Sequence, residues 1–188
     1  MRIVAGQFRG RKLAEVGAGD AAARLRPTSD RVRESLFNIL ETGEFPGFDG
    51  ARVLDIFAGT GALGFEALSR GAAFALFVDD GPAARALIRE NIDTLGVIGT
   101  TKLYRRDATR LGENRGKPYD YVFLDPPYGQ RLGERALASA RAGGWLAERA
   151  VVVWEEGRDV TSPPWLELVD SRRYGETRVR LGRVQTLV

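Results

Sequence analysis

Four consecutive residues, Asp125-Pro126-Pro127-Tyr128, directly follow an apolar run at residues 121–124. Two adjacent prolines cannot continue a central strand, so we expect the backbone to leave a sheet here with a carbonyl free of the strand ladder. A carboxylate, the Pro126 carbonyl and an aromatic ring then converge. These groups suit a flat base with an exocyclic amine, because two acceptors take the amine hydrogens and the ring offers a stacking surface.

An exocyclic amine of this kind is a poor nucleophile, because its lone pair is delocalised into the ring. Acceptance of both hydrogens, by Asp125 and by the Pro126 carbonyl, favours a pyramidal nitrogen whose lone pair points at an electrophilic methyl group. Such a transfer needs positioning and electrostatics rather than a nucleophilic side chain. The sequence contains no His and no Cys, which excludes imidazole bases, thiolate nucleophiles, disulfides and thiolate metal sites.

A second motif combines a carboxylate with a glycine turn. The apolar run at residues 53–57 carries Asp55 and leads into Gly59-Thr60-Gly61, and residues 62–70 then have a helical pattern. A buried strand, a tight turn and a helix start bring backbone N–H groups against a nucleotide-like ligand.

The nature of that ligand is open from this motif alone. Gly59-x-Gly61-x-x-Gly64, with Asp79 about twenty residues further on, satisfies the dinucleotide pattern. The Asp55 carboxylate beside the turn would repel a pyrophosphate, but it suits a ligand with an ammonium and a sulfonium group. S-adenosylmethionine carries both groups and is therefore favoured, while a dinucleotide and a turn without a ligand remain alternatives.

The positive charge is concentrated at the N-terminus. The chain of 188 residues has a net charge of +3, and the whole excess lies in residues 1–41, mostly as Arg. Arg suits bidentate phosphate contacts and base stacking. We therefore predict two parts: residues 1–42, a basic hairpin and helix that bind RNA, and residues 43–188, a neutral catalytic domain.

The pattern after residue 50 alternates between strands and helices. We predict strands at 52–57, 74–78, 101–106, 119–124 and 150–154, helices at 62–70, 82–95 and 131–142, and a final antiparallel hairpin of residues 165–171 and 177–188. Such alternation indicates an α/β fold with a mostly parallel sheet. Within residues 1–42 we predict a basic edge hairpin in 1–15 and a helix whose apolar stripe includes Val32 and Leu36.

The two motifs together resemble amino-group methyltransferases, which have a Rossmann-like, seven-stranded S-adenosylmethionine-dependent fold. The run Arg-Pro-Thr-Ser-Asp-Arg-Val-Arg-Glu-Ser-Leu-Phe-Asn at residues 26–38, with the opening residues 2–6 and 10–13, is similar to the RsmD family. Members of that family methylate the N2 amine of one guanine, at position 966, in bacterial 16S ribosomal RNA. The resemblance covers nearly the whole chain and implies the same fold here, with a small basic N-terminal extension.

The resemblance also implies roles for the matching residues. Asp125, Pro126, Pro127 and Tyr128 would receive the guanine. The donor pocket would contain Asp55, Phe57, Gly59, Thr60 and Gly61, with Asp79 at the ribose and Asp107 and Ala108 at the adenine. Since the family usually has Glu where this chain has Asp79, a bridging water or Asp80 would complete the ribose contact. Thr28 and Ser29 are either helix caps or part of the donor site.

The proposed RNA-phosphate contacts are basic residues of the N-terminal part, with three further candidates near the C-terminus. The first group is Arg9, Arg11, Lys12, Arg24, Arg26, Arg31 and Arg33, and the second is Arg172, Arg173 and Arg178. We expect 16S rRNA in an assembled or partly assembled small subunit as the substrate, a cytoplasmic monomer, and neither a metal nor a membrane contact.

Three other functions remain open from the sequence. An adenine-N6 methyltransferase acting on DNA or RNA shares the Asp-Pro-Pro-Tyr motif, although 188 residues leave little room for a separate target-recognition domain. A dinucleotide-dependent oxidoreductase is the second alternative. The third is a non-catalytic ribosome assembly factor on the same fold.

Overall fold

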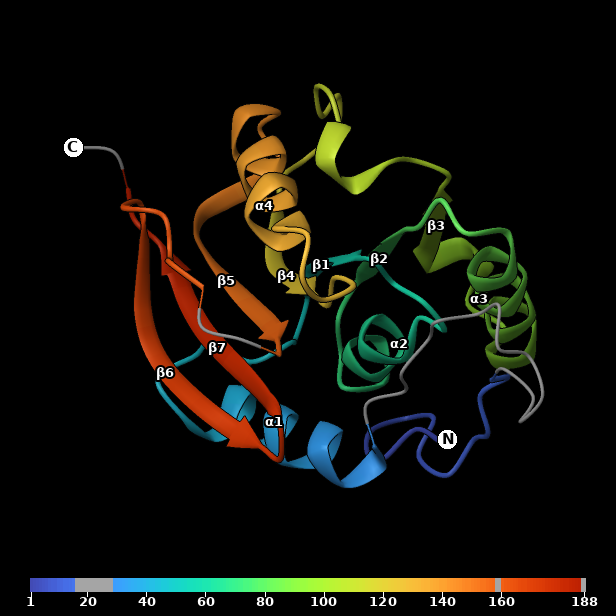
Figure 1. Cartoon of the computed structure of the whole chain (residues 1–188). Coiled ribbons are helices and arrows are strands. Elements are labelled where there is room, and N and C mark those ends of the chain that lie inside the picture. The colour runs from blue at the N-terminus through green and yellow to red at the C-terminus, as the bar shows by residue number, and fades with distance from the viewer. Residues whose placement is uncertain (16–28, 158–159, 187–188) are drawn as a thin grey trace.

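The computed structural model describes residues 1–15, 29–157 and 160–186. In these residues, seven strands form one sheet in the order β3-β2-β1-β4-β5-β7-β6 (Figure 1). The parallel strands are β1 (Arg52–Ile56), β2 (Phe74–Val78), β3 (Thr101–Tyr104), β4 (Tyr119–Leu124) and β5 (Leu146–Glu156). The antiparallel strands are β6 (Leu166–Tyr174) and β7 (Thr177–Val184). The α/β fold with a mostly parallel sheet is confirmed.

Helices cover both faces of the sheet (Figure 1). One face carries α1 (Asp30–Thr42), α2 (Ala62–Ser69) and α3 (Pro82–Leu95), and the other carries α4 (Leu132–Ala142). Two short 3-10 turns, η1 (Ile98–Thr100) and η2 (Ala108–Arg110), flank β3. The ends of α3 follow directly from its sequence, because Pro82 supplies a first-turn residue that needs no N–H partner and Gly96 adopts the left-handed conformation, φ +69°.

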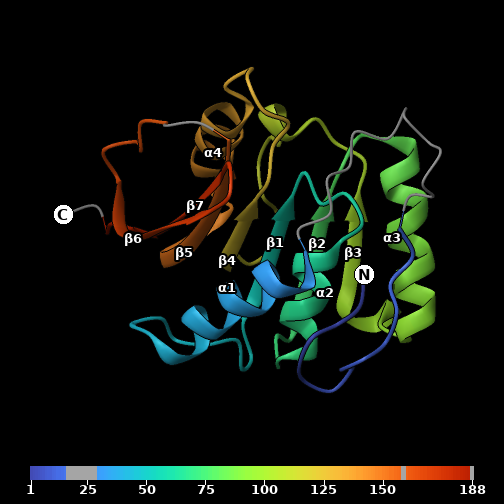
Figure 2. The ribbon, with the colours of Figure 1, turned by 60° about the horizontal axis from the view of Figure 1, so that its bottom comes forward.

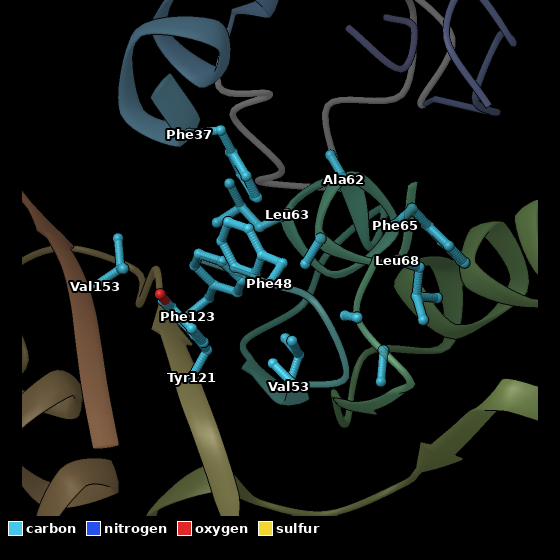
Figure 3. Packing of buried hydrophobic residues seen from close by; sticks show 14 of the residues in the cluster. Phe37, Phe48, Val53, Ala62, Leu63, Phe65, Leu68, Tyr121, Phe123 and Val153 are labelled. Carbon is cyan, nitrogen blue, oxygen red and sulfur yellow. The ribbon is translucent and has the colours of Figure 1, made fainter. Parts of the chain in front are cut away.

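The larger hydrophobic core joins α1 to the sheet (Figure 3). The ring of Phe37 on α1 lies 5.1 Å from that of Phe48 and 5.5 Å from that of Phe123 on β4. Phe48 in turn lies 4.5 Å from the ring of Tyr121. The helix that the sequence places in the basic N-terminal part therefore shares one core with the sheet. Leu36 of the predicted stripe is buried there together with Phe37, which the prediction did not include, whereas Val32 is only partly buried.

Several strand boundaries differ from the sequence prediction: β3 ends at Tyr104, before the predicted residue 106, and β5 and β6 extend further than predicted. β6 continues to Tyr174, so the hairpin turn contains only Gly175 and Glu176, with Gly175 at φ +63°. This is a tight turn that allows pairing up to its edge. β5 begins at Leu146, earlier than predicted, because Leu146 already pairs with Tyr119 of β4; an irregularity that includes Arg149 at φ +59° separates this pair from the continuous pairing that starts at Val151.

Residues 1–15, which we call the N-terminal arm, were predicted as a hairpin at a sheet edge, and this placement is wrong. The arm has one antiparallel bridge, between Arg2 and Lys12, and it lies against α2 and α3 (Figure 2). Its backbone N–H groups at Val4 and Ala5 donate to the Glu66 carboxylate at 2.9 and 3.0 Å. Because these N–H groups are satisfied by helix side chains, they need no neighbouring strand.

Candidate functional site

The carboxyl ends of β1, β2 and β4 lie side by side (Figure 2). We call this line of strand ends the edge that carries the site; it is distinct from the outer strands β3 and β6. Ile56 of β1 is in register with Val78 of β2 and with Leu124 of β4, so the loops that follow these strands leave the sheet side by side. Chain order reverses between β1 and β4, and ligands of open α/β sheets bind at such a point. Asp79 and Asp125, the first residues after β2 and β4, therefore lie at this edge together with Asp55.

The glycine turn after β1 has a constrained backbone. Phe57 adopts φ +59° although it is not a glycine, and Gly59 and Gly61 adopt φ +59° and +78°. A Cβ atom at Gly61 would lie 2.6 Å from the Phe65 ring, so only glycine fits there. Strained backbone at a ligand-facing turn is typical of functional loops. Gly61 precedes α2, whose first N–H groups consequently face the same edge.

Asp55 is buried, with 2% of its surface exposed, and its Oδ2 accepts a hydrogen bond from the Gly64 N–H at 2.9 Å. Burial raises the pKa of this carboxyl to about 8; the Gly64 hydrogen bond opposes the rise and the Asp79 carboxylate adds to it. Burial makes the ionised form of Asp55 unfavourable, and a nearby positive charge would stabilise that form. The site therefore favours a cationic ligand.

Asp79 connects two loops at the edge. Its Oδ2 accepts from the Gly59 N–H at 3.0 Å, and its Oδ1 accepts from the Gly81 N–H at 2.8 Å. Burial raises its pKa, and the two backbone hydrogen bonds oppose that rise. Each carboxylate oxygen keeps a second lone pair, so Asp79 has capacity left for two hydroxyl groups of a ligand. Asp80 is exposed, and its backbone carbonyl accepts from Arg85 at 2.5 Å.

Asp107 caps the 3-10 turn η2. Its Oδ1 accepts from the backbone N–H and the hydroxyl of Thr109, at 2.8 and 2.7 Å, and these bonds lower its pKa. The capping role explains the residue without a ligand. Ala108 is buried, and the end of β3 at Tyr104 contacts the Asp79 loop through its carbonyl, 3.2 Å from the Asp79 N–H.

The Asp125–Tyr128 motif leaves the sheet next to several acids. Burial raises the pKa of Asp125 well above its usual value, and the carboxylates of Glu155, Asp55 and Glu156 raise it further. Pro126 is buried and Pro127 is exposed. The edge of the sheet therefore combines a buried acidic group with backbone N–H groups of the glycine turn, a set that suits a ligand with positive charge.

The Tyr128 ring is fixed from two sides. Its hydroxyl shares a hydrogen bond of 3.1 Å with the Thr177 hydroxyl at the start of β7. Its ring lies close to the backbone at Gly157, where a Cβ atom would come within 2.7 Å of ring carbons. Any side chain at residue 157 would thus displace the ring.

Among the predicted RNA contacts that the structure describes, Arg33 is a correction. The Arg33 side chain is fully buried; its Nε lies 3.4 Å from Glu66 and its Nη2 donates to Asp30 at 2.9 Å and to the Arg2 carbonyl. It cannot reach RNA phosphates in this fold. The prediction failed because Glu66, within an apolar helix, requires buried cationic partners.

The other predicted RNA contacts in the described N-terminal residues lie on the N-terminal arm and on α1. Arg9, Arg11 and Lys12 are exposed, but Arg11 donates to the carbonyl of Thr94 at the far end of α3, at 2.6 Å, away from the strand ends that carry Asp125. Arg31 is exposed on the first turn of α1. Ser29 caps that helix, accepting from the Val32 N–H. Arg24, Arg26 and Thr28 lie outside the described residues.

On the final hairpin, the three further candidates for RNA contacts are exposed or half-buried. Arg172 pairs with Asp170 at 2.9 Å, and Arg173 donates to the Gly175 carbonyl. Arg178 opposes Glu156 across the β5–β7 pair.

Sequence reasoning missed four residues that shape the site. Glu66 and Asn91 are fully buried and bind the N-terminal arm, whereas Gly157 and Thr177 hold Tyr128. A signal existed for the first two, because each is a polar residue on the apolar stripe of a helix, and such residues need buried partners. Gly157 and Thr177 contact the motif only through tertiary packing, which no local pattern indicates.

The described residues contain no group of three or more acids that could hold a metal ion. No helix in the described ranges is long and apolar enough to cross a bilayer.

Comparison with known proteins shows the family to which the chain belongs. A family model described as conserved hypothetical protein 95 matches residues 1–183. The chain is 41% identical over 155 residues to ribosomal RNA small subunit methyltransferase D of Escherichia coli, covering 82% of this chain and 74% of that protein. It is 36% identical over 175 residues to the protein of the same name from Haemophilus influenzae, covering 88% and 84%. Among solved structures, yhhF of Escherichia coli superposes with a TM-score of 0.85 at 37% identity, over 100% and 99% of the two chains.

Proposed function

The chain belongs to the family described as conserved hypothetical protein 95, the RsmD family of methyltransferases, and from this premise we propose that it methylates the N2 amine of a specific guanine in 16S ribosomal RNA. The single observation that carries the proposal is the placement of Asp125 and Pro126 at the carboxyl end of β4, next to the buried Asp55 and the glycine turn. Acceptors for an amine thus adjoin a buried carboxyl that a cation would stabilise in its ionised form.

The methyl donor that fits these residues is S-adenosylmethionine, which supplies an electrophilic methyl group on a sulfonium. Asp55, Phe57 and the turn Gly59-Thr60-Gly61 would hold its methionine part. Asp79 would bind its ribose with the lone pairs that the Gly59 and Gly81 N–H groups leave free. The acidic groups at the edge favour binding of the positive charge over binding of an anionic dinucleotide.

The protein's own part in the transfer is to orient and deprotonate the amine. The Asp125 carboxylate and the Pro126 carbonyl accept its two hydrogens, and the Tyr128 ring stacks on the base. When the nitrogen gains the methyl group it loses one proton, for which Asp125 is the acceptor. The raised pKa of Asp125 makes its carboxylate a stronger acceptor than an exposed one. Arg31 and the arginines of the final hairpin would contact the RNA backbone.

The test is transfer of a labelled methyl group from S-adenosylmethionine to small ribosomal subunits that lack the modification, followed by digestion to nucleosides. We expect the label in N2-methylguanosine with the wild type and none with Asp125→Ala. Label in N6-methyladenosine would replace this proposal with an adenine methyltransferase. Donor binding without transfer to either the subunits or naked 16S rRNA would favour an assembly factor.

A further inference from the structure

A groove lies between α1 and the tip of the β6–β7 hairpin, two segments that run side by side in Figure 1. Its volume is about 430 Å³, and it is lined by Arg31, Val32, Ser35, Tyr174 and Gly175. These five residues supply an aromatic ring, an aliphatic side chain and a cation, and none carries a carboxylate. The groove therefore offers a stacking surface and an anion contact.

Two hydroxyl contacts, joined by one cross-strand pair of the hairpin, connect this groove to the Asp125–Tyr128 motif. The hydroxyls of Ser35 and Tyr174 are 3.0 Å apart, and Tyr174 pairs with Thr177 across the two-residue turn. The Thr177 hydroxyl then meets that of Tyr128 at 3.1 Å. The same hairpin tip thus forms one wall of the groove and holds the ring on which we propose the target base stacks.

We propose that the groove is the subsite for the nucleotide next to the target guanine, with its base against the Tyr174 ring and its phosphate at Arg31. The inference rests on the proposed function, because it assumes an RNA strand whose target base lies at Asp125. When a base leaves its stack, its covalently attached neighbour has to lie beside the motif. Single-stranded RNA is commonly bound by stacking on Tyr and by Arg contacts to phosphate.

Charge favours RNA over an apolar or basic protein segment as the occupant. Besides Arg31, the hairpin that forms the wall carries Arg172, Arg173 and Arg178, all within four residues of Tyr174. Arg31 on α1 and Arg172, which lies on the same face of β6 as Tyr174, place positive charge beside the aromatic ring, which suits a strand with one phosphate per base.

Tyr174 also anchors the hairpin to α1 through Ser35, so the variants must separate stacking from anchoring. Tyr174→Phe removes the hydroxyl and keeps the ring, whereas Tyr174→Ala removes both. We expect Tyr174→Ala to raise the KM for unmodified small subunits about tenfold or more, and Tyr174→Phe to stay within about twofold of the wild type. Both should bind S-adenosylmethionine, measured by calorimetry, as the wild type does.

Arg31→Ala should raise the same KM less, with kcat unchanged, while Arg89→Ala on the exposed surface of α3 serves as the matched control. An unchanged KM in Tyr174→Ala, with N2-methylguanosine formed normally, would overturn the subsite and leave the proposed function standing. Failure of the wild type to methylate would instead overturn the proposed function itself.

A direct mapping does not depend on a comparison of kinetic constants. With p-benzoylphenylalanine in place of Tyr174, irradiation of the complex with unmodified subunits should link the groove to a nucleotide immediately beside the methylated guanine, detected by primer extension. A crosslink to a ribosomal protein, or to RNA distant from the guanine, would contradict the proposal.

Discussion

The side-chain amide of Asn91, fully buried in α3, donates a hydrogen bond to the carbonyl oxygen of Thr60, 3.0 Å away in the glycine turn. The same side chain pairs with both backbone groups of Ala14: its Oδ1 accepts from the N–H at 2.6 Å, and its Nδ2 donates to the carbonyl at 3.3 Å. One amide thus joins the end of the N-terminal arm to the turn that we propose holds the methyl donor.

Asn91→Ala should weaken donor binding and release the end of the arm together. The change leaves the Thr60 and Ala14 groups without partners, at a cost of about 1–3 kcal/mol. We expect the Kd for S-adenosylmethionine to rise about fivefold or more, and the Ala14 amide to lose protection in hydrogen exchange. Asn38→Ala, at an exposed position on α1, is the control. A lower melting temperature with an unchanged Kd would limit Asn91 to a structural role.

Asp55→Asn should stabilise the donor-free protein at neutral pH. With a folded pKa of about 8 and an unfolded pKa of about 3.9, the folded state keeps a proton that the unfolded chain loses between these values. The stability of the wild type therefore falls as pH rises from about 4 to about 8, and levels off above. The stability of the variant does not fall in this way, so its melting temperature should exceed that of the wild type by an amount that grows from about pH 4 to about pH 8, reaching about 2–4 °C or more at pH 8. Thermal melts from pH 5 to 9 would show it.

The same group should make donor binding pH-dependent. A cationic donor favours the Asp55 carboxylate, so binding releases a proton below pH 8 and the affinity rises with pH up to about 8. Calorimetry in two buffers of different ionisation enthalpy measures the released proton directly. Equal proton release by the wild type and Asp55→Asn would mean that another group titrates.

The sequence was sufficient to predict what depends on local pattern. The alternation after residue 50 predicted the α/β sheet, and Asp55, Asp79 and Asp125 were correctly assigned to the ends of strands that meet in register. Burial was harder. Arg33 has the same charge as the exposed Arg31 two residues away, but it shares the buried face of α1 with Leu36 and Phe37, and the charge is accepted there because Glu66 lies beside it. Contacts between distant segments leave no trace in local periodicity.

Glu155→Gln should shift the acid limb of the activity profile to lower pH. Burial raises the pKa of Asp125, and among the neighbouring carboxylates Glu155 raises it most. Removal of that charge lowers the Asp125 pKa, so the carboxylate that accepts the amine hydrogens persists at lower pH. The measurement is kcat/KM for methyl transfer between pH 5 and 9. Glu167→Gln, on the exposed side of β6, should leave the profile unchanged, and a shift toward higher pH would contradict this assignment.

Arg33→Met should destabilise the fold without acting on RNA directly. The buried Glu66 carboxylate would keep Arg70 at 3.0 Å and the arm N–H groups, but would lose Arg33. Removal of one partner from a buried charge network costs several kcal/mol, and we expect about 2–4 kcal/mol because Arg70 remains. Urea unfolding measures this cost.

The double variant Arg33→Met with Glu66→Gln should recover part of the loss, since it removes the uncompensated charge as well. Arg31→Met, two residues away on the exposed side of α1, should unfold as the wild type does while binding RNA more weakly. If Arg33→Met instead kept full stability and lost RNA affinity, the guanidinium would contact RNA as its charge alone suggests, and Arg33 would have to release Glu66 and the Arg2 carbonyl when the substrate binds.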